Sequence, residues 1–152
     1  MAQTPPAAAV SRLLETALYV EDVAAVSRFY REVLGFAFLA GRDPDCPGPN
    51  EPGFMALAVP GGTVLLLFQT GRFTTPTQLP GGTIPPHDGR GQLHLAFAID
   101  AAQLSAWRAR FAEAGVPIEG EVRWARGGWS LYFRDPAGNL VELATPGLWE
   151  TY

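Results

Sequence analysis

The spacing of hydrophobic residues predicts a strand, a helix and three further strands in the first half of the chain. Residues 13–20 form a run typical of a β-strand, and residues 23–34 carry apolar side chains at helical spacing. Asp22 precedes the helix as a capping residue, and Gly35 follows it, where a left-handed residue commonly ends a helix. The further strands are expected at residues 36–40, 54–59 and 63–69.

The same order of elements appears a second time after a long segment rich in Gly, Pro and Thr. A helix opening at Asp100 or Ala101 and closing at Gly115 follows the first strand of this second half. Three more strands come after it, and a turn precedes the last one. The predicted strands of the second half cover residues 92–99, 118–125, 129–134 and 139–145.

The two halves can be aligned with each other, so the chain contains two copies of one β-α-β-β-β unit. Placing Glu15 on His94 superimposes the glycines that end the two helices, after one inserted residue. The last strands then pair Leu66 with Glu142, which gives a repeat of about 76–79 residues. Because element order and turn positions agree at once, we expect two tandem modules.

These modules predict one α+β domain over residues 13–148. It consists of a first module at 13–69, a linker at 70–91 and a second module at 92–148. Residues 1–12 are expected to form a flexible lead that lies outside the domain.

Composition narrows the class of protein. At 152 residues, 47% hydrophobic and 17% charged, the chain has enough apolar material for a compact core. The formal net charge is -4, and its acids and bases are mixed, so no basic patch predicts binding to nucleic acid or to a membrane. No transmembrane run or signal peptide is evident, which favours a cytoplasmic protein. The single cysteine, Cys46, excludes an internal disulfide and has the character of a spectator thiol.

Three of four positions related by the repeat carry residues that can bind a metal ion. These are Glu15, His94 and Glu142, while Leu66 occupies the fourth position. Singly, each residue fits a structural role, as a glutamate on a solvated strand face or a hydrogen-bonded core histidine. Together, polar side chains among apolar neighbours at equivalent positions indicate a divalent cation, which offsets the cost of burying them.

Several motifs resemble those of the vicinal oxygen chelate superfamily, which includes glyoxalases, bleomycin resistance proteins and extradiol dioxygenases. Residues 15–22 (ETALYVED), followed by 29–36 (FYREVLGF), resemble its opening signature. Residues 91–97 (GQLHLAF) and 132–143 (YFRDPAGNLVEL) resemble the corresponding segments of the second module. The resemblance extends from about residue 13 to residue 148, nearly the whole chain.

The resemblance implies that paired βαβββ modules form a curved, cupped mixed sheet around one divalent metal, in a protein that is often a homodimer. The implied ligands are Glu15, His94 and Glu142. Many characterised members have His or Gln in place of Glu15, and Leu66 replaces the fourth ligand of glyoxalase-I-like members. Two carboxylates and one imidazole favour Mn, Fe(II), Ni or Mg and admit Zn, and three protein ligands leave positions open for a substrate.

The implied function is a metal-dependent enzyme that acts by Lewis-acid chemistry on a small oxygen-chelating substrate. A lyase, isomerase, hydrolase or transferase reaction fits this ligand set. An extradiol-type dioxygenase is less favoured, because the set has one histidine fewer than the two-histidine, one-carboxylate triad. Two alternatives stay open: a non-catalytic drug-binding protein of the bleomycin-resistance type, and a fosfomycin-type thiol transferase. Residues 126–136 resemble the final strands of the fosfomycin-type enzymes.

Candidate pocket residues lie on the strands near Glu142, which is itself a candidate for catalysis. Tyr132 and Arg134 are further catalytic candidates, and Arg134 fits either an anionic substrate or a cap on the following turn. His87, in the linker, fits either an acid/base residue that reaches over the site or a solvated loop histidine. Other residues that could line the pocket are Trp124, Arg126 and Trp129.

Overall fold

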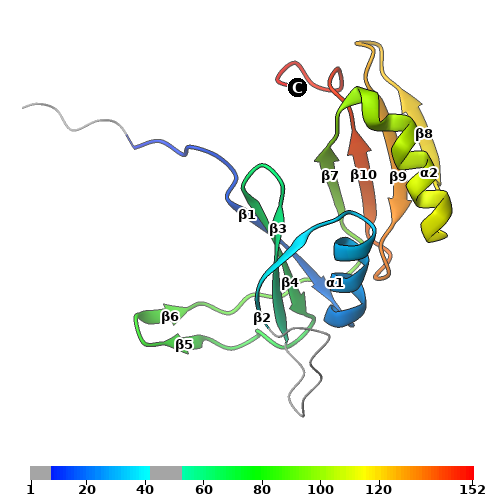
Figure 1. Ribbon diagram of the computed structural model, residues 1–152. Helices are drawn as coiled ribbons and strands as arrows, with labels where there is room; N and C mark the ends of the chain where they lie inside the picture. Colours follow the sequence, from blue (N-terminus) through cyan, green and yellow to red (C-terminus); the bar gives the residue numbers. More distant parts are fainter. Residues whose placement is uncertain (1–7, 42–52) are drawn as a thin grey trace, which may run out of the picture.

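The computed structural model of the chain describes residues 8–41 and 53–152. The loop that contains Cys46 and the first part of the predicted flexible lead lie outside the described residues. Figure 1 shows two groups of strands, each accompanied by one helix, and an arm that projects from the first group.

The first module has the predicted β-α-β-β-β order. The strands form one mixed sheet in the order β1-β4-β3-β2, in which β1 runs parallel to β4 and the other pairs are antiparallel. Asp22 caps the helix as expected, since its Oδ1 accepts a hydrogen bond of 2.8 Å from the backbone N–H of Ala25. Gly35, at φ 76°, follows the helix. The elements are β1 (Glu15–Val20), α1 (Val23–Glu32), β2 (Ala37–Gly41), β3 (Phe54–Val59) and β4 (Thr63–Gln69).

The second module repeats this arrangement with the sheet order β7-β10-β9-β8. A single turn of 3-10 helix, η1, precedes its α-helix, and Gly115 ends that helix in a left-handed conformation with φ 66°. The elements are β7 (His94–Ala98), η1 (Ala101–Gln103), α2 (Leu104–Ala114), β8 (Gly120–Arg123), β9 (Trp129–Arg134) and β10 (Leu140–Ala144).

The strand registers confirm the alignment of the two halves. In the first sheet Ala17 pairs with Leu66, and in the second sheet Ala96 pairs with Glu142. Ala17 and Ala96 each lie two residues after the first residue of their strand, which is Glu15 and His94 respectively. Leu66 and Glu142 therefore occupy equivalent places in two equivalent sheets, as the repeat predicts.

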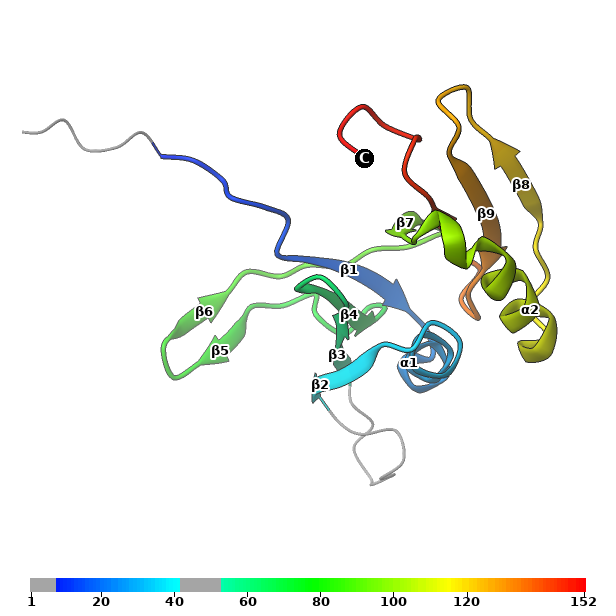
Figure 2. The same ribbon diagram turned by 45° about the horizontal axis from the view of Figure 1, so that its top comes forward.

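The linker contains a β-hairpin that the sequence pattern does not predict. Strands β5 (Thr77–Leu79) and β6 (Gly82–Ile84) form an antiparallel pair that projects from the first module as an arm (Figures 1 and 2). Strands of three residues are too short to show an alternating pattern. The base of the arm is clamped by bonds of 2.9 Å from the N–H of His87 to the carbonyl of Phe73 and from the N–H of Gly71 to Asp88 Oδ1.

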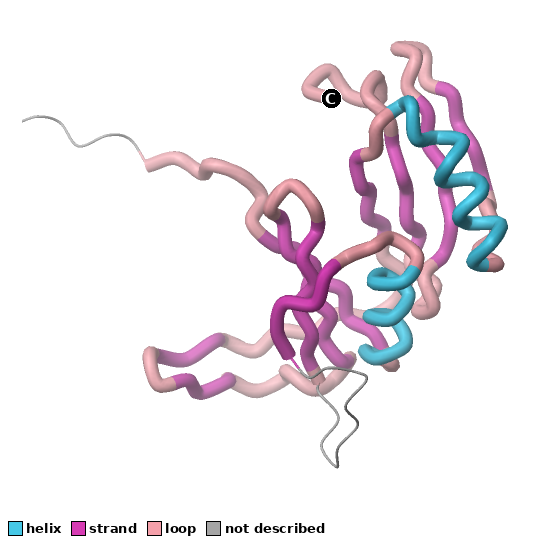
Figure 3. The backbone as a smooth tube through the Cα atoms, in the orientation of Figure 1, coloured by secondary structure: helices cyan, strands magenta, loops and turns pink. Residues whose placement is uncertain are grey.

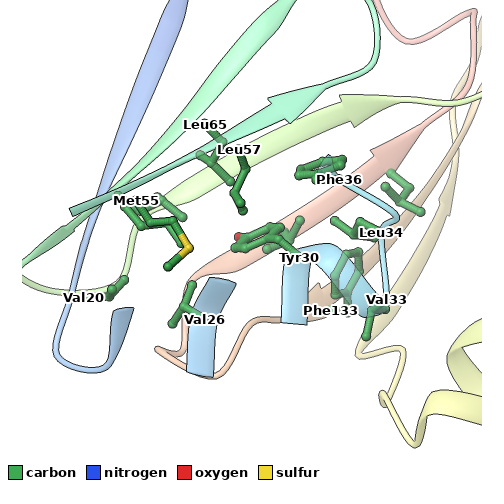
Figure 4. Close-up of a cluster of buried hydrophobic side chains, with 14 of the residues drawn as sticks. Val20, Val26, Tyr30, Val33, Leu34, Phe36, Met55, Leu57, Leu65 and Phe133 are labelled. Carbon is green, nitrogen blue, oxygen red and sulfur yellow. The ribbon is translucent and has the colours of Figure 1, made fainter. Parts of the chain in front are cut away.

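Helix α1 lies between the two sheets and joins the modules in one core (Figures 1 and 3). Tyr30, in the last turn of α1, is fully buried and stacks on Phe36 (Figure 4). Its hydroxyl donates a 3.0 Å bond to Asp135 Oδ2 in the second module. Burial, with Asp135 adding to it, raises the pKa of Tyr30 well above its ordinary value. Arg110 of α2 also donates to the carbonyls of Glu32 and Val33 at the end of α1.

This arrangement is the α+β architecture of two tandem βαβββ modules that the sequence predicts. One face of each sheet packs into the shared core, and the opposite face of each sheet lies outside it. None of the described helices is long and apolar enough to cross a lipid bilayer.

The Tyr30–Asp135 bond is expected to stabilise the packing of the two modules. Tyr30→Phe should lower the free energy of unfolding by about 1–2 kcal/mol, because Asp135 retains its bonds from Ala137 and Asn139. Tyr152→Phe is the matched control, since its hydroxyl also bonds across strands but is partly exposed, and water can replace it. Urea unfolding of both variants measures the difference, and equal losses would contradict the assignment.

Candidate functional site

His94 and Glu142 meet on the open face of the second sheet. His94 is the first residue of β7 and Glu142 is the third residue of β10, and Nε2 of the imidazole lies 3.3 Å from Oε2 of the carboxylate. The Glu142 side chain is 5% exposed and that of His94 is 50% exposed. The pair therefore combines a buried carboxylate with an imidazole that solvent or a ligand can reach.

The other ring nitrogen of His94 determines where the proton of the neutral imidazole lies. Nδ1 is 3.0 Å from the carbonyl oxygen of Leu140. A carbonyl only accepts hydrogen bonds, so Nδ1 carries the proton, and Nε2 of the neutral ring presents its lone pair toward Glu142. A lone pair facing a carboxylate oxygen is unfavourable unless a proton or a cation lies between them. A doubly protonated imidazole satisfies this geometry, and so does a cation held between the two groups.

Glu142 is held in position by hydroxyl groups on its second oxygen. Oε1 accepts a short hydrogen bond from Ser130 and a 3.1 Å bond from the Tyr132 hydroxyl. The Ser130 oxygen in turn accepts a 2.8 Å bond from Nε1 of Trp124. Because protein donors occupy Oε1, Oε2 is the oxygen left for His94 and for the open face of the sheet.

Burial raises the pKa of Tyr132, and the neighbouring Glu142 carboxylate contributes to this shift, which a hydrogen bond with Ser130 opposes. The phenol consequently keeps its proton at neutral pH and remains a hydrogen-bond donor. Tyr132, a candidate pocket residue from the sequence, contacts Glu142 directly through this bond, and its catalytic role stays a prediction.

Glu15 lies on the other sheet. It is exposed on β1 and lines an apolar recess over the first sheet, together with Leu66 and Phe68 but without His94 or Glu142. In residues 8–41 and 53–152, no three His, Cys, Asp or Glu side chains are grouped so that they could hold a metal ion. One chain thus brings together two of the three predicted ligands, and Glu15 as a ligand stays a prediction.

The two arginine candidates are engaged with other parts of the protein. Arg134 donates from Nε to Glu119 and from Nη1 to the carbonyl of Gly138, both at 3.1 Å, which corresponds to the turn-capping alternative. Arg126 pairs with Glu150 at 2.6 Å near the end of the chain. Of the two tryptophan candidates, Trp129 lies under the guanidinium of Arg108. Trp124 is connected to Glu142 through the hydroxyl of Ser130.

Sequence reasoning missed Ser130. Alternation along β9 places Ser130, Tyr132 and Arg134 on one face and the buried Leu131 and Phe133 on the other. A serine on the face that carries the predicted ligand was the available signal, but a single serine is common at such positions. Its importance follows from the pairing of β9 with β10, which the sequence does not specify side chain by side chain.

His87 is not a solvated loop histidine. Its ring is half-buried, stacks on Phe73 with an interplanar angle of 10° and lies within 2.9 Å of the Tyr19 hydroxyl through Nδ1. It lines the recess over the first sheet, a cavity of about 680 Å³ that also contains Glu15 and Leu66. The long linker thus contributes to a pocket, although at the opposite sheet from His94 and Glu142.

Comparisons with known proteins agree with this architecture. The family model for the Glyoxalase/Bleomycin resistance protein/Dioxygenase superfamily matches residues 12–143. The crystal structure of lactoylglutathione lyase from Agrobacterium tumefaciens is 34% identical in sequence, with a TM-score of 0.75 over 97% of this chain and 99% of that one. The antibiotic binding protein TnmS3 from Streptomyces sp. CB03234 is 28% identical, with a TM-score of 0.62 over 92% of this chain and 99% of that one.

A shorter match relates the chain to a curated enzyme. Over 59 residues it is 46% identical to metallothiol transferase FosB from Shouchella clausii (strain KSM-K16), and the match spans 38% of this chain and 40% of that protein. The family model, by contrast, covers most of the chain and both modules. The chain belongs to the glyoxalase/bleomycin resistance protein/dioxygenase superfamily.

Proposed function

We propose that the protein is a divalent-metal-dependent enzyme that acts on a small substrate bound through adjacent oxygen atoms. The observation that carries this proposal is the approach of His94 Nε2 to Glu142 Oε2 on an open sheet face, with the imidazole proton held on Nδ1. A ring nitrogen and a carboxylate oxygen that both present lone pairs to one point suit Mn, Fe(II), Ni, Mg or Zn.

Each residue has a distinct role in this proposal. His94 and Glu142 hold the ion, which when bound supplies Lewis-acid polarisation of a substrate oxygen. Ser130 and Trp124 orient the Glu142 carboxylate. Tyr132 keeps its phenolic proton and is placed to donate a hydrogen bond at the edge of the metal centre, so it is the candidate for holding or delivering a proton during the reaction.

We further propose that the reaction is a lyase or transferase reaction on a thiol-derived substrate. Two relatives carry names that refer to thiol compounds, the metallothiol transferase from Shouchella clausii and the lactoylglutathione lyase from Agrobacterium tumefaciens. An oxygenase reaction has less support, because only one histidine is available among the predicted ligands.

We propose that Glu15 of a second copy of the chain completes the metal centre. Glu15 and His94 are equivalent in the repeat, yet within one chain they lie on separate sheets. No described strand pairs with the outer edge of β1 or of β7. In a two-fold dimer, the first module of one copy could therefore face the second module of the other and bring Glu15 to the His94–Glu142 pair.

A non-catalytic binding protein is the second candidate, and the aromatic recess favours it. The antibiotic binding protein TnmS3 shares the fold, and a pocket lined by aromatic rings suits ligand capture without chemistry. Elemental analysis of untagged protein, purified without chelator, discriminates between the two functions. Near-stoichiometric divalent metal supports the enzyme, whereas protein that neither contains nor takes up metal would contradict it and leave the binding function.

Ser130→Ala is expected to weaken metal binding although Ser130 is not a ligand. The variant removes the hydroxyl that holds Oε1 of Glu142, and loss of such an outer contact commonly weakens metal binding about 10–100-fold. Competition with a fluorescent chelator measures the affinity. Ser105→Ala, an exposed serine on α2, is the matched control and should bind as tightly as the unchanged protein. Unaltered affinity in Ser130→Ala would argue against Glu142 as a ligand held by this network.

A further inference from the structure

The residues that follow β10 form a strap at one end of the second sheet. This strap consists of residues 145–152 and lies beside the turn between β8 and β9 (Figures 1 and 2). Thr145 joins it to the first residue of β9 by two bonds. Its backbone N–H donates at 2.9 Å to the carbonyl of Trp129, and its Oγ1 accepts at 2.8 Å from the N–H of Trp129. At the other end of the strap, the Tyr152 hydroxyl donates to two carbonyls of the second module, at 3.1 and 3.2 Å. The strap is therefore tied at both ends.

The backbone of the strap touches the backbone of the β8–β9 turn at two glycines. A Cβ atom on Gly128 would lie 2.7 Å from the carbonyl carbon of Gly147 and 2.9 Å from the backbone nitrogen of Leu148. A Cβ atom on Gly147 would lie 2.6 Å from the backbone nitrogen of Gly128. Backbone atoms cannot move aside as the end of a flexible side chain can. Any residue other than glycine at either position would consequently push the strap and the turn apart.

The turn held in this way positions Trp124, which is connected to the Glu142 carboxylate. The backbone N–H of Trp124 donates a 2.8 Å bond to the carbonyl of Gly128, and its indole Nε1 donates a 2.8 Å bond to Ser130 Oγ. An indole N–H can only donate, so the Ser130 oxygen accepts from it. The single proton of the hydroxyl is then directed at Glu142 Oε1, with which Ser130 makes a short bond. Trp124 thus determines the direction in which the Ser130 hydroxyl donates.

The equivalent positions of the first module carry apolar residues. In the registers of the two sheets, Phe54 is the counterpart of Ser130. Leu66 is likewise the counterpart of Glu142. These two side chains have no hydroxyl and no carboxylate, so they cannot form the same hydrogen bond. The polar contacts accompany the carboxylate and are not required by the fold of a module, which is expected of groups that orient a metal ligand.

We propose that the strap positions Glu142, the proposed metal ligand, through the β8–β9 turn. Contact with Gly128 fixes the turn, the turn places the indole of Trp124, and the indole directs the Ser130 hydroxyl at the carboxylate. Oε2 of Glu142 is thereby held toward His94. The inference rests on the proposed function for the role of the metal. The arrangement of the turn itself requires no metal, so the two proposals can be tested separately.

Exchange of the Trp124 indole N–H with water, in protein stripped of metal with EDTA, tests the inference. Nuclear magnetic resonance measures this exchange, and Trp124→Phe assigns the signal. Gly128→Ala should speed the exchange about tenfold, the equivalent of one lost hydrogen bond. The hydrogen-bonded N–H of Val33 at the end of α1 should exchange at an unchanged rate, which separates a local effect from a general loss of stability. Gly120→Ala is the matched control, because a Cβ there would lie at an ordinary 3.8 Å from the Tyr132 ring.

Metal affinity, measured by competition with a fluorescent chelator, then tests the connection between the strap and Glu142. Gly128→Ala should weaken metal binding about tenfold, the lower end of the effect of outer contacts, and Gly120→Ala should leave it unchanged. Thr145→Val is a second variant, which keeps the shape of the side chain but removes the acceptor of the Trp129 N–H. It should change both measurements in the same direction, whereas Thr145→Ser keeps the hydroxyl and should restore them. Circular dichroism confirms that each variant is folded.

Each outcome separates this inference from the proposed function. Unchanged indole exchange in both Gly128→Ala and Thr145→Val would overturn the inference, and so would equal acceleration at Trp124 and Val33. Faster indole exchange without loss of affinity, in a protein that binds metal, would show that the strap does not position Glu142. Faster indole exchange in a protein that never takes up metal would support the hold of the strap on Trp124 and overturn the enzyme. Should Gly128→Ala fail to fold, the comparison of Thr145→Val with Thr145→Ser decides the question.

Discussion

Glu142→Ala is expected to abolish stoichiometric metal binding. Loss of an outer contact to a metal ligand weakens metal binding by up to about 100-fold, so loss of the ligand itself should lower the affinity by at least about 100-fold. The variant removes a buried carboxylate and leaves His94 as the one predicted ligand on this sheet. His94→Ala should have a comparable effect, because it removes the other partner of the same pair. Plasma mass spectrometry of protein dialysed against a limiting metal buffer measures the occupancy directly.

The fold should survive the Glu142→Ala substitution, because Glu142 faces the open side of the sheet and the core lies on the other side. Tyr132 is partly exposed, so water can replace its lost acceptor, whereas the buried Ser130 keeps its hydrogen bond from Trp124. Glu113→Ala, at an exposed position on α2, is the matched control and should keep full metal content. Full occupancy in both Glu142→Ala and His94→Ala would show that the metal site is assigned to the wrong residues.

A mixed dimer of two metal-free variants is expected to regain half of its metal. If Glu15 from one copy joins His94 and Glu142 of the other, a dimer of Glu15→Ala with His94→Ala contains one centre with all three ligands and one with neither Glu15 nor His94. Each homodimer lacks one ligand at both centres. The expected occupancy is therefore about one ion per mixed dimer, compared with two in the unchanged dimer.

Coexpression of the two variants with different tags, neither of them containing histidine, allows the mixed dimer to be isolated by successive purification steps. The control pairs Glu15→Ala with Glu15→Ala and should stay empty. No gain of metal in the mixed dimer would place all the ligands in one chain, and a protein that sedimented as a monomer while it held metal would contradict the shared centre outright.

The repeat allowed the fold and the equivalent site positions to be predicted from the sequence. Aligning the two halves made Leu66 equivalent to Glu142, and the pairing of Ala17 with Leu66 and of Ala96 with Glu142 confirms that alignment. The cap at Asp22 and the helix end at Gly115 followed from local chemistry that depends on a few neighbouring residues. Local patterns and the repeat were therefore sufficient for the elements of the two modules, although not for the hairpin in the linker.

The placement of one module against the other was not contained in those patterns. Periodicity identifies the face of a strand that is buried, but it does not specify which other element covers that face. Helix α1 fills this role through Tyr30 and its bond to Asp135, and the consequence is that Glu15 and His94 lie apart within one chain. The contacts of Ser130 and His87 depend on the same tertiary arrangement, which explains why sequence reasoning did not identify them.

The clamp at the base of the β5–β6 arm has a consequence for how the protein can change. Because Phe73 and His87 are joined by a backbone hydrogen bond, the chain leaves and re-enters the body of the molecule at nearly the same point. The segment between them is a closed loop that can be lengthened, shortened or exchanged without moving either module. Related sequences should vary in length between Phe73 and His87. Directed evolution confined to this segment should change the ligand preference while both modules stay unchanged.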